Sequence, residues 1–312
     1  YEPGALTLVV RAGTALAEVE RVLAAERQRL AFEVPDLRGL LGREGVSTIG
    51  GVLAANASGP RRVQVGAARD AALGVRFVDG TGSVVKNGGR VMKNVTGYDL
   101  VKLLAGSRGT LGVLSEVSFK VQALPEAEAT LVVEGLGDEA GLAALRVALG
   151  SPFDVSGAAR HTGRSLIRVE GMAGSVAYRV GRLGALVGGD VTVAEAEASA
   201  MLWRGVRDVA PLTGKTGEVW RIATLPTAAA EVVSRTGGEA LWDWGGGLVW
   251  LLLDSGRGAE VAAAVAGRGH ATLVKGEGAP VFPPEAPDVA ALVAGLKAKF
   301  DPRGILNRGM MG

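Results

Sequence analysis

The chain has 312 residues, of which 48% are hydrophobic, so it is long enough for one large or two ordinary domains with a packed core. The formal net charge is only +2, and no cluster of lysine and arginine is interleaved with aromatic residues, which argues against nucleic-acid binding. The absence of cysteine excludes disulfides, cysteine-ligated zinc and iron–sulfur clusters in this chain, and no apolar run is long enough to span a bilayer.

The first elements predicted along the chain are a strand over residues 5–11 and a helix that follows it. Thr14 is the expected N-cap of this helix. Leu16, Val19 and Leu23 recur with helical spacing, which predicts one buried face. Residues 33–45 contain a proline and several glycines and are expected to form a loop.

The next stretch, residues 47–59, is unusually rich in small side chains. A hydroxyl residue, Thr48, precedes the pair Gly50 and Gly51, and a single amide, Asn56, lies among alanines. Small residues let the backbone approach a flat ring or an anion, and free N–H groups in a turn or at a helix start attract negative charge. A glycine pair alone is more often a tight turn, so that interpretation stays open here.

Two further glycine-rich stretches follow. The first contains Gly66, Asp70 and Gly74 and leads into a predicted hairpin of strands 75–79 and 83–86. A short helix is expected over residues 99–105. The second stretch, Gly109-Thr-Leu-Gly-Val113, opens a predicted strand over residues 110–121.

Taken in order, these three motifs resemble the FAD-binding domain shared by vanillyl-alcohol oxidase and p-cresol methylhydroxylase (PCMH). Residues 57–62 and 89–99 resemble more specifically the FAD-binding E subunit of bacterial glycolate oxidase, and the resemblance extends from residue 1 to the end of the chain. It implies an α+β fold and non-covalently bound FAD. The implied cofactor-binding residues are Thr48, Ile49, Gly50, Gly51, Ala54, Asn56, Ala57, Ser58, Gly59, Gly66, Asp70, Gly74, Gly109, Thr110, Gly112 and Val113.

The resembled family has another subdomain before the point where this chain begins. That subdomain carries a loop that helps to hold the FAD pyrophosphate. Because this chain opens almost directly on a strand, with no secretory signal before it, we expect the PCMH-type domain to be N-terminally incomplete, either as a fragment or after cleavage.

Pro125 and the acidic, alanine-containing run after it mark a predicted boundary between a FAD-binding domain (1–125) and a cap or substrate domain (126–312). The second part alternates between strands and helices in two rounds, which favours an antiparallel sheet of ferredoxin-like layout. Its predicted strands are 129–134, 166–171, 190–193, 218–225, 247–254 and 271–274, and its predicted helices are 139–149, 176–187, 227–235 and 259–267. A closing helix is expected over residues 287–300. Residues 301–307 resemble the C-terminal motif of related flavin dehydrogenases, and a turn ending the helix is an equally good interpretation.

Other candidate sites are weaker. Residues 135–141 read GxGxxxG rather than the dinucleotide fingerprint, and residues 214–216 end like a P-loop without its first glycine. His161 and His270 have no partner pattern, so we predict no metal site and no histidyl link to a flavin. Related 2-hydroxyacid dehydrogenases use a histidine-rich cluster that this sequence lacks.

Arg221 is a candidate catalytic residue, because a cap arginine can pair with a substrate carboxylate in a bidentate manner. An arginine in a salt bridge or in solvent is the commoner situation, and the neighbouring tryptophans at 220, 242 and 244 are more often core or interface anchors.

Three hypotheses for function follow from the resemblance. The first is a FAD-binding subunit of a glycolate-oxidase-like complex that oxidises small 2-hydroxyacids with a second flavoprotein subunit and an iron–sulfur subunit. The second is an autonomous FAD-dependent 2-hydroxyacid dehydrogenase, and the third is a non-catalytic assembly subunit without flavin. The implied location is cytoplasmic, with membrane association through the partner subunits as the alternative.

Overall fold

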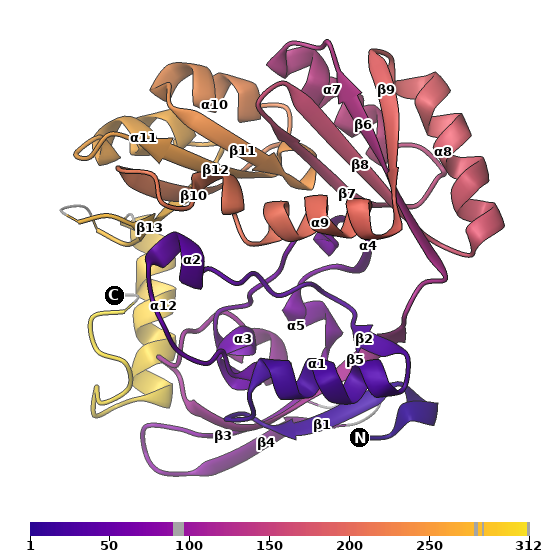
Figure 1. The fold of residues 1–312 in the computed structure, drawn as a ribbon. Helices are drawn as coiled ribbons and strands as arrows, with labels where there is room; N and C mark the ends of the chain where they lie inside the picture. Colours follow the sequence, from indigo (N-terminus) through magenta and orange to yellow (C-terminus); the bar gives the residue numbers. More distant parts are fainter. Residues whose placement is uncertain (90–96, 278–279, 283, 311–312) are drawn as a thin grey trace.

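The computed structural model describes residues 1–89, 97–277, 280–282 and 284–310. It has two lobes, each built on its own antiparallel sheet (Figure 1). The first sheet has five strands and the second has eight, and helices cover both. This is the expected α+β class. Residues 90–96, which belong to the motif at 89–99, lie outside the described residues.

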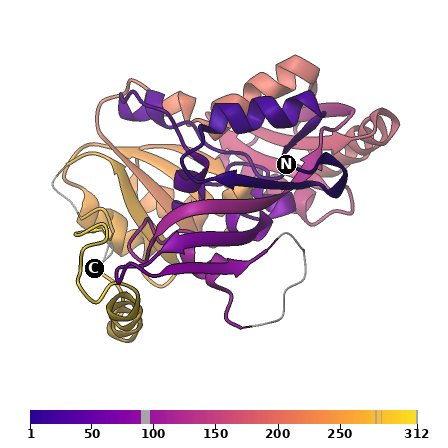
Figure 2. The ribbon, with the colours of Figure 1, turned by 90° about the horizontal axis from the view of Figure 1, so that it is seen from below.

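The first lobe has the strand order β1-β5-β3-β4, with β2 added beside β5 (Figure 2). Its core is built from apolar side chains on the inner face of this sheet and on the short helices above it, including the fully buried Leu23, Leu53, Phe77, Leu104 and Phe119. The elements are η1 (Pro3–Ala5), β1 (Thr7–Arg11), α1 (Leu16–Ala25), β2 (Gln28–Leu30), α2 (Arg38–Leu41), α3 (Ile49–Ala54), α4 (Arg62–Val65), α5 (Ala68–Ala71), β3 (Ala72–Val78), β4 (Val84–Gly88), α6 (Leu100–Leu104) and β5 (Val113–Ala123).

Two expectations in this lobe were wrong in detail. Thr14 does not cap α1: the N-cap position falls on Ala15 and carries no side-chain hydrogen bond. Ala15 forms an isolated bridge with Thr48, and the Ile49 N–H donates to the Thr14 carbonyl. This pairing holds the segment extended and shifts the helix start. The stretch expected to be a loop before residue 45 also contains the short helix α2.

The second lobe consists of two βαββαβ units joined edge to edge. Each unit has its strands in the ferredoxin order, and together they give β13-β10-β12-β11-β7-β8-β6-β9. The elements are β6 (Ala127–Glu134), α7 (Asp138–Leu149), β7 (Val155–His161), β8 (Arg164–Gly171), α8 (Ala173–Val187), β9 (Asp190–Glu195), α9 (Ala196–Arg207), η2 (Ala210–Leu212), β10 (Glu218–Thr224), α10 (Ala229–Thr236), β11 (Glu239–Asp243), η3 (Trp244–Gly246), β12 (Leu248–Leu253), α11 (Gly258–Val265) and β13 (Gly269–Lys275).

Strand β7 and helix α9 are absent from the predicted elements. Strand β7 is rich in small residues with low strand propensity, among them Gly157. A Cβ at Gly157 would lie 2.7 Å from the ring of Trp203 on α9, so glycine is what lets the helix pack directly onto the strand.

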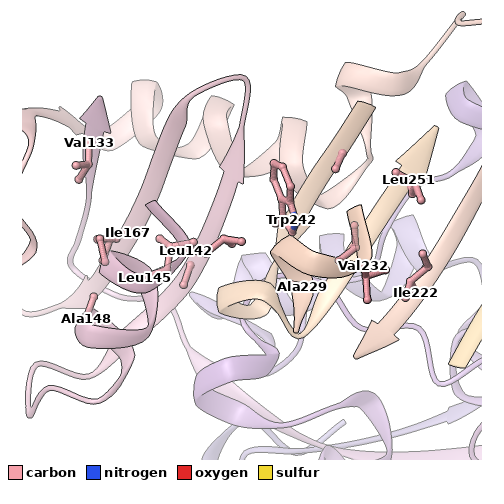
Figure 3. Close-up of a cluster of buried hydrophobic side chains, with 14 of the residues drawn as sticks. Val133, Leu142, Leu145, Ala148, Ile167, Ile222, Ala229, Val232, Trp242 and Leu251 are labelled. Carbon is pink, nitrogen blue, oxygen red and sulfur yellow. The ribbon is translucent and has the colours of Figure 1, made fainter. Parts of the chain in front are cut away.

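The second lobe buries apolar side chains on both faces of its sheet. On one face, side chains such as Leu142 and Ile167 pack in one unit and Ile222 and Val232 in the other, with Trp242 between them (Figure 3). On the opposite face, Trp203 of α9 and Leu40 of α2 belong to one buried cluster with residues of the strands. Helix α2 therefore ties the first lobe to the second.

Helix α12 (Pro287–Phe300) returns the chain to the first lobe. The ammonium group of Lys297 donates to the Thr110 carbonyl at 2.8 Å, and the ring of Phe300 lies 6.2 Å from that of Phe77. Asp301 is buried and packs against Gly80, where no side chain would fit. The division of the chain at residues 125 and 126 stays a prediction. Among the described helices, none combines the length and apolar character needed to cross a membrane.

Five charged side chains are joined where the two lobes meet. The Arg168 guanidinium donates to both carboxylate oxygens of Glu33, at 2.8 and 3.0 Å. Glu170 accepts from Arg61 at 3.0 and 3.1 Å and from Arg29 at 2.6 Å. Burial alone would raise the pKa of Glu170, but the charges of the three arginines outweigh it and hold that pKa well below its usual range. Since Glu33, Arg61 and Arg29 belong to the first lobe and Arg168 and Glu170 to the second, this network is a polar joint between them.

Replacing one carboxylate in this network should be strongly destabilising. We expect Glu170→Gln to lower the free energy of unfolding by about 3–5 kcal/mol, because it leaves buried guanidinium groups without their partner. Urea denaturation at pH 7 measures this. The control is Glu18→Gln, which breaks an exposed pair with Arg21 and should cost less than about 1 kcal/mol.

Because the pKa of Glu170 is lowered in the folded state, its contribution is complete above the ordinary glutamate pKa of about 4.3 and is lost as the pH falls below that value. The difference between wild type and Glu170→Gln should therefore shrink in acid. An equal difference at pH 3.5 and pH 7 would contradict the assignment.

Candidate functional site

The small-residue stretch forms helix α3, and its two glycines have different surroundings. Thr48 caps the helix, with its Oγ1 accepting from the Gly51 N–H at 3.3 Å. A Cβ at Gly50 would lie 2.6 Å from the Cβ of Ala12, so Gly50 is required for packing against the end of β1. A Cβ on the exposed Gly51 would meet only the Thr48 hydroxyl at 3.2 Å. Gly51 thus presents open backbone to the outside of the helix.

The end of α3 lies against the loop that contains Gly109. The Gly106 N–H donates to the Leu53 carbonyl at 3.0 Å, and the Arg108 N–H donates to the Ala54 carbonyl at 2.8 Å. Asn56 follows the helix with a positive φ of 47°, and its side-chain oxygen accepts from the Arg69 N–H at 3.0 Å. The fold therefore brings the first and third glycine-rich motifs side by side.

Several of the predicted cofactor-binding residues have packing or capping roles. Ile49 is fully buried. An added Cβ at Gly74 would collide with Gly89 and Ser118, and one at Gly112 would collide with the ring of Phe77. Asp70 caps α5 and packs against Gly66. Contact of these residues with a cofactor stays a prediction.

The remaining predicted residues divide between buried and open positions. Ser58 and Thr110 are buried and hydrogen-bonded within the lobe, Ala57 packs against the core, and the Gly59 carbonyl accepts from Trp244. By contrast, Gly109 has open space at its Cβ position and Val113 is 59% exposed.

Three arginines gather around aromatic rings where the lobes face each other. The guanidinium carbons of Arg62 and Arg221 lie 4.5 and 5.4 Å from the ring centroid of Trp244. Arg108 lies 4.9 Å from the ring centroid of Phe282. The indole N–H of Trp244 donates to the Gly59 carbonyl at 3.1 Å, which fixes the ring across the lobe boundary. Arg221 is the predicted candidate, whereas Arg62 and Arg108 were not singled out.

The arginine cluster, defined as Arg62, Arg108 and Arg221, is short of negative charge. Within the described part of the chain, none of their guanidinium groups forms a salt bridge. Burial, and then the positive charges of Arg62 and Arg108, lower the pKa of Arg221 to about 10. Burial also lowers the pKa of Arg62 and of Arg108. All three stay charged at neutral pH, so the cluster is electropositive.

Asp243 lies directly before Trp244 and is 2% exposed. Its carboxylate accepts from the Trp244 N–H at 2.7 Å. Burial raises the pKa of Asp243 to about 7, with a smaller contribution from the charge of Glu33. At neutral pH this group is therefore only partly ionised, and it compensates the arginine cluster incompletely.

The histidines lie apart from each other. His161 pairs with Glu239 at 2.9 Å, and Glu239 also binds Lys215 of the P-loop-like segment. His270 lies on β13, and burial followed by the charge of Arg221 lowers its pKa. No group of three histidine or acidic residues able to hold a metal ion is found in residues 1–89, 97–277, 280–282 and 284–310.

The residues present fit a flat, anionic cofactor such as FAD at this face. The exposed Gly51 leaves room for close approach and Asn56, which follows the helix, offers an amide. Arg108, whose N–H donates to the Ala54 carbonyl, supplies positive charge. The sequence signal for Arg62 is its position in the motif at residues 57–62, and Arg108 directly precedes the motif at 109–113. No spacing rule places either residue near Arg221.

Comparison with protein families supports this interpretation. Residues 1–88 match the family model described as FAD binding domain. Over 313 aligned residues the chain is 36% identical to glycolate oxidase subunit GlcE of Escherichia coli K12, covering all of this chain and 83% of that protein. It is 40% identical over 87 residues to glycolate oxidase subunit GlcD of Bacillus subtilis, covering 28% of this chain and 18% of that protein.

Among solved structures, alkyldihydroxyacetonephosphate synthase superimposes with a TM-score of 0.64 at 16% sequence identity. The alignment covers 98% of this chain and 65% of the synthase chain. At this identity the likeness concerns the fold alone.

The raised pKa of Asp243 gives a prediction for stability against pH. The folded state keeps a proton on Asp243 that the unfolded chain releases near pH 4, so this group's contribution to stability falls as the pH rises from about 4 to about 7. In Asp243→Asn that decline should disappear, while the amide oxygen still accepts from Trp244. The free energy of unfolding, measured for both proteins at pH 4.5 and 7, should fall by roughly 1–3 kcal/mol more in wild type. Equal changes in the two proteins would show that Asp243 is ionised throughout.

Proposed function

Because the chain belongs to the GlcE family of glycolate oxidase subunits, and is thus a FAD-dependent oxidoreductase subunit, we propose that it takes part in oxidising small 2-hydroxyacids such as glycolate to glyoxylate within a multi-subunit complex. The observation that carries this is that the open small-residue face of α3 adjoins Arg108 of the arginine cluster, whose N–H donates to the Ala54 carbonyl at 2.8 Å. The partners in this proposal are a second flavoprotein subunit and an iron–sulfur subunit.

The cofactor-binding face in this proposal is formed by Gly51, Ala54, Asn56 and Gly109. Gly51 and Gly109 admit close approach, since a Cβ at Gly109 meets nothing within 4 Å. The Asn56 side-chain oxygen is already used by the Arg69 N–H, which fixes the amide plane and leaves its NH₂ group to donate. When bound, FAD supplies the chemistry of accepting electrons from the substrate.

The substrate-binding group in this proposal is Arg221. A guanidinium binds a carboxylate through two parallel N–H···O bonds, which fixes the orientation of a hydroxyacid as well as its position. Arg221 lies on β10 of the second lobe, and its guanidinium carbon is 5.4 Å from the ring centroid of Trp244. Its surroundings are partly desolvated, which strengthens binding of an anion relative to water.

The first test concerns Gly51. We expect Gly51→Val to abolish flavin retention, because a branched side chain would occupy the open face without disturbing the core. The measurement is the visible absorption spectrum of the purified chain after incubation with FAD and gel filtration. Gly174→Val is a matched control in the first turn of α8, where a Cβ meets nothing within 4 Å.

Both variants should unfold at the wild-type temperature. Gly50→Ala, by contrast, should lower the unfolding temperature because its Cβ would clash with Ala12. Unchanged flavin content in Gly51→Val would remove the residues around Gly51 from the cofactor site.

The second test concerns the partners. Co-expression with the second flavoprotein subunit and the iron–sulfur subunit of the proposed complex should yield one species in size-exclusion chromatography. This species should reduce a dye when glycolate is added. A chain that purifies alone in the presence of those subunits would contradict the complex. Activity of the isolated chain would instead support an autonomous dehydrogenase.

A further inference from the structure

We propose that a polar cavity at the joint between the lobes binds a small oxyanion, which is a carboxylate or a phosphate group. The cavity has a volume of about 500 Å³ and lies where the chain leaves β5 for the second lobe (Figure 1). Among the described residues that line it, none belongs to the arginine cluster or to the cofactor-binding face of the proposed function. Its polar lining residues are Arg29, Gln64, Asp70, Lys120, Gln122 and Glu170.

Three of these side chains lie on one face of the first sheet because of the strand register. Strands β2 and β5 are antiparallel, and Arg29 lies directly opposite Gln122. Opposite residues of an antiparallel pair project to the same face, as do residues two apart in one strand. Lys120 therefore joins Gln122 and Arg29 on that face. A guanidinium, an ammonium group and a primary amide thus line the same cavity.

The donors on this face are only partly used inside the protein. Arg29 donates through Nη1 to Glu170 at 2.6 Å, whereas its Nε is buried without a partner among the described residues. A guanidinium has five N–H donors, so Arg29 retains the capacity to bind a further acceptor. Lys120 is exposed and forms no salt bridge within the part of the chain that the structure describes.

The charge balance of the buried network also favours an anion at this cavity. Three arginines, Arg29, Arg61 and Arg168, share two carboxylates, those of Glu33 and Glu170. The network therefore carries one positive charge in excess. Burial lowers the pKa of Arg29, and the charges of Arg61 and Arg168 add to this effect while that of Glu170 opposes it. Arg29 is the member of the network on which the excess charge is least compensated.

The other carboxylates near the cavity are engaged elsewhere. Asp70 lines the cavity, but it accepts from the backbone at the start of α5 and lies 3.5 Å from the Lys102 ammonium group. Glu128, which acts on the second-lobe arginine of the network, accepts from the Ser199 hydroxyl. Neither of them contributes to the pKa shift of Arg29. An anion from outside the chain is therefore what balances the charge of Arg29.

A ligand in this cavity strengthens the joint between the lobes. Strands β2 and β5 line the cavity from the first lobe, and Glu170 and Gly171 of β8 line it from the second. Arg29 binds Glu170 across this boundary. A ligand that binds the folded chain and not the unfolded one raises the unfolding temperature by mass action.

The experiment measures the unfolding temperature of the full chain at pH 7.5 with millimolar probe, against sodium chloride at the same ionic strength. Inorganic phosphate represents a phosphate group, and acetate represents a carboxylate. At ten times its dissociation constant, the preferred probe should raise the unfolding temperature by roughly 2–4 °C. The probe with the lower dissociation constant identifies the source of the oxyanion. No rise above the chloride reference with either probe would overturn the proposal.

The first variant removes a cation without touching the buried network. Lys120→Gln should weaken binding of the preferred probe at least ten-fold, because a hydrogen bond to a charged group is lost. The matched control is Lys86→Gln, since Lys86 is an exposed lysine on β4 of the same sheet and does not line this cavity. Its affinity should equal that of wild type. The same loss in both variants would indicate a general charge effect and would contradict the assigned cavity.

The second variant supplies the missing negative charge from within the chain. Gln122→Glu places a carboxylate opposite Arg29. It should raise the unfolding temperature without ligand and abolish the response to the probe. A lower unfolding temperature would show that Arg29 is not short of negative charge, and a retained response would place the anion elsewhere.

A third variant separates this cavity from the arginine cluster. The response to the preferred probe should be unchanged in Arg221→Gln. If it is lost there, the anion binds at the arginine cluster and the cavity proposal fails, while the proposed substrate role of Arg221 stands. Conversely, a chain that retains no FAD but keeps the response that depends on Lys120 refutes the proposed function alone.

Discussion

The buried network between Glu33 and Glu170 and their arginine partners determines how the two lobes meet. Each carboxylate has a longer ion pair within its own lobe, Glu33 with Arg61 at 3.3 Å and Glu170 with Arg168 at 3.6 Å. Its shorter ion pairs cross the boundary, because Arg168 of the second lobe binds Glu33 and Arg61 of the first lobe binds Glu170. A buried charge without a partner is costly, so the geometry in which both carboxylates are paired is strongly preferred over a displaced one. The relative position of the lobes is in this way tied to a small number of hydrogen bonds of defined direction.

The joint has a direct effect on the arginine cluster. Arg61 is part of the network and Arg62, the next residue, lies over Trp244. The guanidinium carbon of Arg168 also lies 4.5 Å from the ring centroid of Trp203, which packs on the face of the second sheet that α9 covers. At positions 61 and 62, a paired arginine and an arginine without a salt bridge among the described residues are thus neighbours along the chain. The paired arginines hold the lobes together, and the arginine cluster has no salt-bridge partner in the part of the chain that the structure describes.

Much of the fold could be predicted from periodicity and from glycine-rich motifs, and the exceptions have physical causes. Helix α12 begins and ends where its pattern indicated, and the hairpin of β3 and β4 forms around the expected turn. Strand β7 escaped prediction because Gly157 serves a partner, Trp203, that is distant in sequence. The same applies to the candidate site. The sequence pattern singled out Gly51 and Arg221. It could not distinguish the exposed Gly51 from Gly50, which packs against Ala12, and it gave no sign that Arg108 affects Arg221. Such distinctions depend on tertiary contacts.

The return of α12 to the first lobe bears on how the protein is made. Lys297 closes onto Thr110 across 187 positions of sequence, and Asp301 fills the space beside Gly80. Contacts of such long range form slowly, since a large loop must close before they contribute. During synthesis, the first lobe therefore emerges before α12, and the surface around Phe77 and Gly80 is covered only after the whole second lobe has been synthesised. During this interval its apolar surface is exposed to other chains, which makes the nascent first lobe a natural client of chaperones.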